Sequence, residues 1–271
     1  MRLVASMFLV IFFILIFLVG LFAATFKFQL LDYDFWKVAF ERHSVYQSLA
    51  ISSKNFLESQ VGKEGGSKND AKVLTDLITT ENVKDFVGKN IQNILSFVNG
   101  RTPQIIVYIP VNIIPKNLLP KNLSGIQSEI LLQDLLTKFN YKDYQNLPLR
   151  ELGRLGWSAT FVFMGLVSLL LIILILLTLL VQEGSRLTAP GIAVFLSGFL
   201  TFILSKIGGS FKTMSSGSLP SSSSFAGVLA GNLLPPLIKE FMKTWSAVGL
   251  TLVATGLVLF FVRKPRYNVP K

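Results

Sequence analysis

The sequence predicts a mainly α-helical membrane protein with four transmembrane helices, arranged as one plus three, and a mostly helical extracytoplasmic domain containing one or two short strands. Hydrophobic residues make up 51% of the 271 residues and charged residues 15%, well below the roughly one quarter usual in soluble domains. Four segments are long and apolar enough to cross a bilayer, which takes about 20 residues. A long polar region, residues 27–156, separates the first segment from the second and is the predicted extracytoplasmic domain.

The four predicted transmembrane helices comprise residues 3–26, 157–181, 189–206 and 245–262. The first is predicted to be an uncleaved anchor, because its apolar run exceeds the roughly 7–15 residues of a signal-peptide core. The third is the shortest, and Lys206 at its end can extend its amino group to the membrane surface. No ionisable side chain lies deeper in any of these segments. This disfavours proton relays and ion-coupled transport, which depend on such groups.

Basic residues predict that both termini are cytoplasmic. Arg2, Arg186 and the basic tail, residues 263–271, would then share the inner side of a plasma membrane, as the positive-inside rule favours. Lysines beside the loop between the third and fourth helices oppose this orientation. That loop, residues 207–244, is predicted to be outer and Gly/Ser-rich, and to end in a juxtamembrane segment in which Pro235-Pro236 opens a helix.

The third transmembrane helix carries a row of small residues at every fourth position. Ala193, Ser197, Thr201 and Ser205 lie on one face, which lets helix backbones approach each other closely. This helix-packing face is predicted to lie within one four-helix bundle, and the alternative is that it mediates self-association.

The extracytoplasmic domain is predicted to contain three main helices and a short one. They comprise residues 32–58, 80–98 and 124–139, with the short helix at 71–79. The helix at 80–98 has the clearest pattern, because its apolar residues recur every three to four positions and Asn99-Gly100 ends it. Ser124 and Gln127 are placed as a capping box for the last helix.

One stretch between these helices, QIIVYIPVNIIP at 104–115, reads as a strand. Its prolines remove hydrogen-bond donors and confine it to a sheet edge or an irregular extended segment. We predict a partner-binding edge formed by Ile105, Val107, Tyr108 and Ile109. The pairing strand is left open between the outer loop, residues 146–149 and a second protein that adds a strand.

The residues offer little catalytic or metal-binding chemistry. The chain has no cysteine and one histidine, His43, so no metal site, cofactor or catalytic residue is predicted. The net charge of +11 comes from basic residues that we predict to lie at membrane boundaries. No basic stripe is interleaved with aromatic residues as in single-strand binding proteins. Nucleic acid is therefore not an expected partner.

The segment LLDYDFWKVAFERHSVYQSLA, followed by the helix ending FVNG and the extended apolar run, carries a family resemblance. Over roughly residues 20–115 the chain resembles uncharacterised bacterial four-span membrane proteins with a large extracytoplasmic domain after the first span. This resemblance implies no function. The one-plus-three threading also resembles claudin-type proteins, whose cysteine pair is missing here, and lipoprotein-export ABC permeases.

Two functional hypotheses follow. The first is an integral, non-enzymatic envelope protein whose extracytoplasmic domain mediates binding or complex assembly. The alternative is a permease-like subunit of a transport or export complex that works with a separate ATPase. The predicted partners are the lipid bilayer and either another protein or a second copy of the chain.

Overall fold

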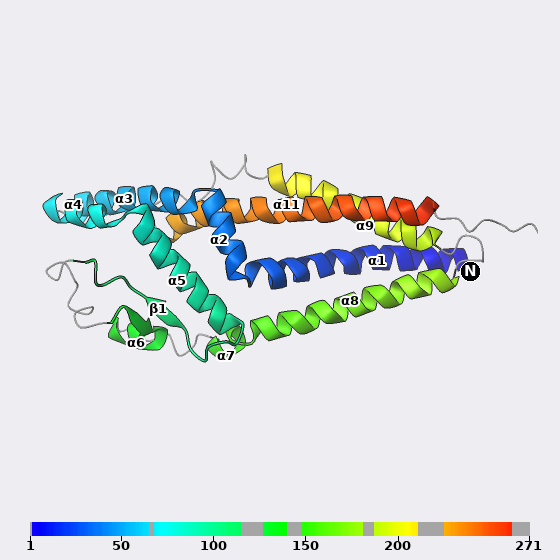
Figure 1. Cartoon of the computed structure of the whole chain (residues 1–271), viewed down its shortest axis with the longest axis horizontal. Coiled ribbons are helices and arrows are strands. Elements are labelled where there is room, and N and C mark those ends of the chain that lie inside the picture. Colours follow the sequence, from blue (N-terminus) through cyan, green and yellow to red (C-terminus); the bar gives the residue numbers. More distant parts are fainter. Residues whose placement is uncertain are drawn as a thin grey trace, which may run out of the picture. The chain divides into compact units, whose positions relative to one another are not determined.

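The structure is a computed structural model that describes residues 2–64, 68–114, 127–139, 148–180, 187–210 and 225–261. Its elements, shown in Figure 1, are α1 (Arg2–Thr25), the π-helix η1 (Phe26–Leu30), α2 (Tyr33–Arg42), α3 (Val45–Glu64), α4 (Lys68–Leu77), α5 (Thr80–Val98), β1 (Ile106–Tyr108), β2 (Glu129–Leu131), α6 (Leu132–Lys138), α7 (Leu149–Leu152), α8 (Leu155–Leu180), α9 (Thr188–Ser210) and α11 (Phe225–Phe261). Ser124, the Gly/Ser-rich stretch 211–224 and the basic tail 263–271 lie outside the described residues.

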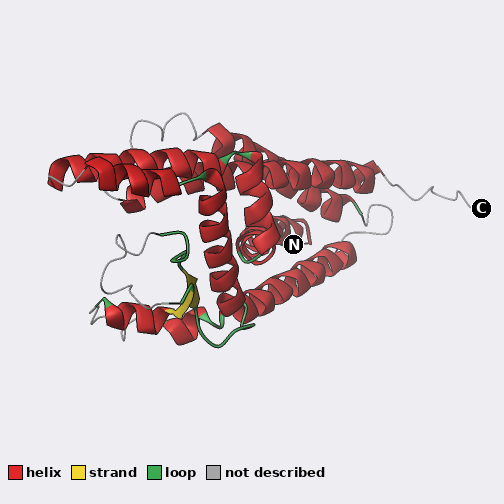
Figure 2. Cartoon of the chain, turned by 60° about the vertical axis from the view of Figure 1, so that its left-hand side comes forward, coloured by secondary structure: helices red, strands yellow, loops and turns green. Residues whose placement is uncertain are grey.

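The predicted fold class is confirmed in its secondary structure, which is mainly helical with two short strands. Helices make up most of the described chain, and two short strands form one small ribbon (Figure 2). Four helical segments are long and apolar enough to cross a membrane: Val4–Leu30, Leu155–Leu180, Thr188–Ser210 and Ala230–Phe261. Large apolar side chains on these helices are exposed, such as Phe8 at 69% and Leu179 at 74%, as suits contact with lipid. This architecture is compatible with a multi-pass membrane protein.

The chain divides into two compact units. Unit 1 comprises Met1–Phe28, Ala159–Met214 and Ile238–Lys271, and unit 2 comprises Gln29–Ser158 and Ser215–Leu237. Unit 1 therefore holds α1, α9, most of α8 and the C-terminal part of α11. η1 is divided between the two units, and α2 to α7 and both strands belong to unit 2.

The core of unit 1 joins α1, α8 and α9. Phe13 of α1, Leu177 of α8 and Ala193 of α9 belong to one buried cluster, and Leu177 and Ala193 are fully buried. Because each helix contributes only a stripe of such residues, its remaining apolar surface faces outward, as in membrane bundles.

Glycines bring α9 and α11 into backbone contact within unit 1. A Cβ atom at Gly198 would lie 2.7 Å from Leu252 Cβ and 2.8 Å from the Gly249 carbonyl oxygen. One at Gly256 would lie 2.5 Å from the backbone nitrogen of Phe195. Gly198 thus meets α11 near residue 249, whereas the earlier residue Phe195 meets α11 at residue 256. The two helices therefore run antiparallel. This close approach is possible because the contact positions carry no side chain.

α11 begins at Phe225 and continues to Phe261 as one helix. Pro235 and Pro236 lie inside it, although the sequence predicted that they would open a helix. The helix therefore starts earlier than expected. At 37 residues it is about 55 Å long, which exceeds the roughly 30 Å hydrocarbon thickness of a bilayer.

Unit 2 begins with a helix that the sequence predicted as longer and continuous. Asp32 caps α2 by accepting a hydrogen bond of 3.1 Å from the Asp34 N–H. The predicted helix 32–58 is interrupted at Ser44, which has a positive φ of 51°, so that α2 and α3 form separate helices. The bend buries Phe40 against Tyr46, with ring centroids 5.6 Å apart.

The α5 prediction is confirmed, with Thr79 as its N-cap and Gly100 at a φ of +72° just after its end. Asn99 at its C-terminus joins three segments of unit 2. Its amide Nδ2 donates to the Leu31 carbonyl oxygen at 2.9 Å, and a Cβ at Gly156 would lie 2.6 Å from Asn99 Oδ1. The starts of α2 and α8 therefore both lie beside the end of α5.

The predicted helix at 124–139 is wrong in its first described part. Residues 129–131 form β2, and α6 begins only at Leu132. Gln127 precedes the strand and so does not lie in the first turn of a helix. The local sequence favours a helix, but pairing with β1 determines the extended conformation.

Candidate functional site

The predicted edge strand is shorter than expected and pairs within the chain. β1 and β2 are antiparallel, with Val107 opposite Ile130 and Tyr108 opposite Glu129. The ladder extends by two further hydrogen bonds, from the Ile109 N–H to the Ser128 carbonyl at 2.8 Å and from the Leu132 N–H to the Ile105 carbonyl at 2.9 Å. One edge of β1 is thus paired with β2.

The other edge of β1 is closed at Tyr108 by a side chain of α5. The Tyr108 N–H donates to Asn90 Oδ1 at 2.9 Å, and Asn90 Nδ2 donates to the Tyr108 carbonyl oxygen at 2.9 Å. The carboxamide therefore supplies one acceptor and one donor, as a neighbouring strand would.

The Tyr108 side chain is also held by α5. Its hydroxyl donates to Asp85 Oδ2 at 2.7 Å, and Lys89 Nζ lies 4.0 Å from the ring centroid and 3.1 Å from Asp85 Oδ1. The hydrogen bond from Tyr108 lowers the pKa of Asp85, and the same bond raises the pKa of Tyr108. These groups fix β1 on α5, with the buried Tyr108 held by the exposed side chains of Asp85 and Lys89.

The small-residue row of α9 is buried. Ala193, Ser197 and Thr201 have no exposed surface, and Ser205 is 3% exposed. The hydroxyls donate to carbonyl oxygens of their own helix, Ser197 to Ala193 and Thr201 to Ser197, each at 2.8 Å. Because these donors are satisfied locally, the row contributes close packing rather than hydrogen bonds to a neighbouring helix.

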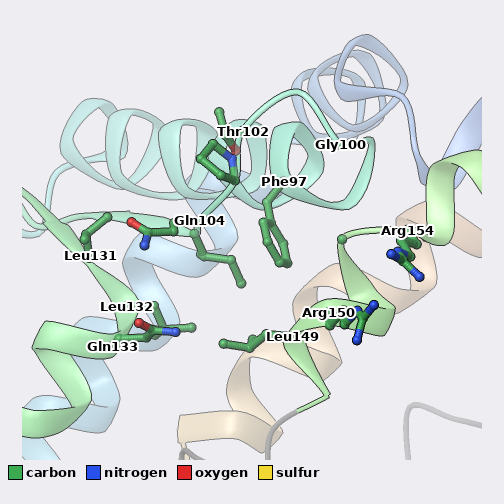
Figure 3. Close-up of a pocket in the computed structure, with 13 residues that line it drawn as sticks. Phe97, Gly100, Thr102, Gln104, Leu131, Leu132, Gln133, Leu149, Arg150 and Arg154 are labelled. Carbon is green, nitrogen blue, oxygen red and sulfur yellow. The ribbon is translucent and has the colours of Figure 1, made fainter.

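A pocket of about 420 Å³ lies in unit 2 between the end of α5, the strand ribbon, α6 and α7. Its floor is apolar, formed by the buried ring of Phe97 and the half-buried side chains of Ile105, Leu131, Leu132 and Leu149. Figure 3 shows Phe97 projecting from α5 toward the middle of this space.

The rim of the pocket is polar and exposed. Gln104 and Gln133 lie on one side, and Arg150 and Arg154 lie on the other (Figure 3). Neither guanidinium group makes an ion pair or a hydrogen bond with the residues that the structure describes. Two cations at the edge of an apolar floor give the pocket an amphipathic lining.

Two residues that line the pocket, Gly153 and Phe97, lie in close contact. A Cβ at Gly153, the C-cap residue of α7, would lie 3.2 Å from Phe97 Cζ, so a larger residue there would require the ring to shift slightly. Thr102 also lines the pocket, and its Oγ1 is buried without a hydrogen-bond partner among the described residues.

Sequence reasoning missed most of this pocket. Of the four predicted edge residues only Ile105 lines it, and the arginines were not singled out. A signal was present, because Arg150 and Arg154 are four residues apart and directly precede the second apolar segment. Their partners Phe97 and Leu131 lie far away in sequence, and no periodicity brings such residues together.

Within the described ranges, no group of three or more His, Cys, Asp or Glu residues is placed to hold a metal ion. His43 is the C-cap residue of α2, and its backbone N–H bonds to the Ala39 carbonyl oxygen.

A scan of protein-family models, a search of curated proteins and a search of solved structures each found no match to this chain. The resemblance to bacterial four-span proteins therefore stays a prediction.

Proposed function

We propose that this chain is a non-enzymatic, multi-pass protein of the plasma membrane with both termini in the cytoplasm. Unit 2 lies outside the cytoplasm, where it binds another component of the cell envelope or organises a complex. The observation that carries this proposal is the pocket of unit 2, which combines an apolar floor with Arg150 and Arg154 at its rim. Concave sites with apolar walls and a few convergent polar groups are typical of ligand-binding proteins.

The pocket supports binding better than the edge of β1 does. Strand addition needs free backbone N–H and C=O groups along one edge. The Ile109 N–H, one residue after β1, bonds to the Ser128 carbonyl oxygen, and both backbone groups of Tyr108 bond to Asn90. A strand-adding partner would have to displace the Asn90 side chain, whereas a ligand can reach the exposed rim of the pocket directly.

The proposed orientation is tested with single cysteines, because the chain has none of its own. Cysteines replacing Ser67, Ser185, Ser222 and Lys271 one at a time are treated in intact cells with a membrane-impermeant thiol reagent. We expect labelling at positions 67 and 222 and protection at 185 and 271 until the membrane is opened. Labelling at 185 or 271 in intact cells would contradict the orientation.

The proposed binding role is tested by photo-crosslinking in cells. A photoreactive amino acid replaces Gln104 or Gln133 at the pocket rim, or Gln92 on the exposed face of α5 as the matched control. We expect the same envelope component to be captured from both rim positions and not from position 92. If all three positions give the same products, or none gives any, unit 2 does not bind through this pocket.

A further inference from the structure

The pocket of unit 2 has two chemically different parts. Its floor is made of apolar side chains, among them Phe97, Leu131 and Leu149. Its rim on the α7 side carries Arg150 and Arg154. A ligand that satisfies both parts must have an apolar body and a negatively charged end.

The position of the arginines in the chain narrows the source of such a ligand. Arg154 is followed directly by α8, which starts at Leu155 and is one of the helices long enough to cross a membrane. If α8 spans the bilayer from Leu155, Arg154 lies at the level of the lipid headgroups, where amphiphiles are concentrated. A guanidinium group binds phosphate or carboxylate through two parallel hydrogen bonds.

We propose that this pocket binds an anionic amphiphile, with its acyl chain on the apolar floor and its phosphate or carboxylate group between Arg150 and Arg154. This inference rests on the proposed binding function and names the ligand class. The volume of about 420 Å³ lies in the range of roughly 300–1,000 Å³ for small-molecule sites, which admits one acyl chain or headgroup rather than a folded peptide.

If the two arginines only anchor the membrane helix, different experimental results are expected. Basic residues at the end of a membrane helix anchor it by contacting lipid headgroups, without any pocket. In that case every nearby cation contributes equally and the length of an acyl chain has no effect. Arg101, which is exposed and does not line the pocket, provides the matched control.

The test uses the full chain in phosphatidylcholine nanodiscs, with Gln133→Cys at the pocket rim carrying an environment-sensitive fluorophore. The probes are dodecyl phosphate, laurate, butyl phosphate, zwitterionic dodecylphosphocholine and inorganic phosphate. We expect saturable binding of dodecyl phosphate and laurate, and binding at least about tenfold weaker for the other three probes.

The arginine variants test the headgroup contact. We expect Arg150→Gln and Arg154→Gln each to weaken dodecyl phosphate binding about tenfold or more, because each removes a charge-assisted contact. Arg101→Gln should leave it unchanged.

Nanodiscs of phosphatidylglycerol separate two sources of the ligand. Loss of the probe response there would identify a bilayer lipid as the occupant, and an unchanged response would identify a free amphiphile.

Five outcomes would overturn the inference. If dodecylphosphocholine bound as well as dodecyl phosphate, Arg150 and Arg154 would be only general membrane anchors. The same would follow if Arg101→Gln weakened dodecyl phosphate binding as much as the Arg150 and Arg154 variants do. Equal binding of inorganic phosphate would make the site one for soluble anions. If no amphiphile binds while the rim still captures an envelope component in cells, the ligand class is wrong and the proposed function stands. If both are absent, both proposals fail.

Discussion

Asn90 of α5 forms a two-way hydrogen bond with the backbone of Tyr108 in β1, with both N···O distances at 2.9 Å. The carboxamide occupies the place of a third strand and ends the sheet at two strands. An exposed strand edge is a template for unwanted pairing with other chains, and native proteins commonly block it. Asn90 blocks the edge with one residue that belongs to a different element.

The first prediction concerns this contact. Asn90→Ala should lower the free energy of unfolding of the protein by about 1–3 kcal/mol, because it leaves the Tyr108 N–H and carbonyl without partners. The better helix propensity of alanine offsets only a few tenths of this. Hydrogen exchange followed by mass spectrometry should show faster exchange across Ile106–Tyr108.

Gln92→Ala is the matched control, since Gln92 lies exposed on the same helix. It should change neither stability nor exchange in β1. Equal exchange rates in the Asn90→Ala variant and the unmodified chain would show that the Asn90 hydrogen bonds do not stabilise the strand.

The second prediction concerns the glycines between α9 and α11. Gly198→Ala places a methyl group 2.7 Å from both Leu252 Cβ and the Val253 nitrogen, so the helices must separate. Overpacking of this kind costs about 1–3 kcal/mol. We expect a lower midpoint when the detergent-solubilised protein is unfolded by increasing amounts of a denaturing detergent.

Gly165→Ala in α8 serves as the control, because a Cβ there would have no heavy atom within 4 Å. It should leave the midpoint unchanged or raise it slightly, since alanine favours the helix. A similar loss in both variants would mean that the loss does not come from the contact between α9 and α11.

Sequence reasoning succeeded where local signals agree with the fold. In α5 the apolar spacing and the turn at Gly100 both lie within a few residues of the feature they determine. It failed at β2, because Glu129–Leu131 is extended only through pairing with β1. It also missed the interruption at Ser44, where no glycine or proline breaks the helix and tertiary packing of Phe40 on Tyr46 decides.

The candidate site shows the same limit. Ile105 was identified from the alternation of its own segment, but the pocket joins it to Arg150 and Leu131 through the folding of separate segments. Asn90 gave no signal either, because asparagine in a helix usually faces solvent. Such residues are recognised only when the elements they join have been placed.

The third prediction is a dependence of stability on alkaline pH. Tyr46 is 6% exposed, and burial raises its pKa to about 12 from an ordinary value of 10. In the unfolded chain this tyrosine loses its proton near pH 10, while the folded chain retains it. The folded state therefore binds more protons, and stability should fall as pH rises from about 10 to 12.

Tyr46→Phe removes the titrating hydroxyl group. It should make the free energy of unfolding less sensitive to pH between about 10 and 12. The absorbance of tyrosinate should also lose its most alkaline step. An alkaline dependence that is identical in the two proteins would contradict the assignment to Tyr46.

The fourth prediction separates packing from hydrogen bonding on α9. Ser197 is fully buried, and its hydroxyl donates to the Ala193 carbonyl oxygen of the same helix. Ser197→Ala removes only this local bond and should change the free energy of unfolding by less than about 0.5 kcal/mol. Ser197→Leu places a larger side chain where there is no free space. It should lower the free energy of unfolding by about 1–3 kcal/mol, measured by the same detergent titration.

The pair of variants also addresses self-association through this face. Because Ser197 and Thr201 are already covered within one chain, Ser197→Leu should destabilise the monomer without altering the molecular mass of the folded protein in detergent. If the variant instead keeps its stability and changes from a dimer to a monomer by light scattering, the small-residue face packs against a second copy. Ser197→Ala should leave the oligomeric state unchanged in either case, since it adds no volume to the contact.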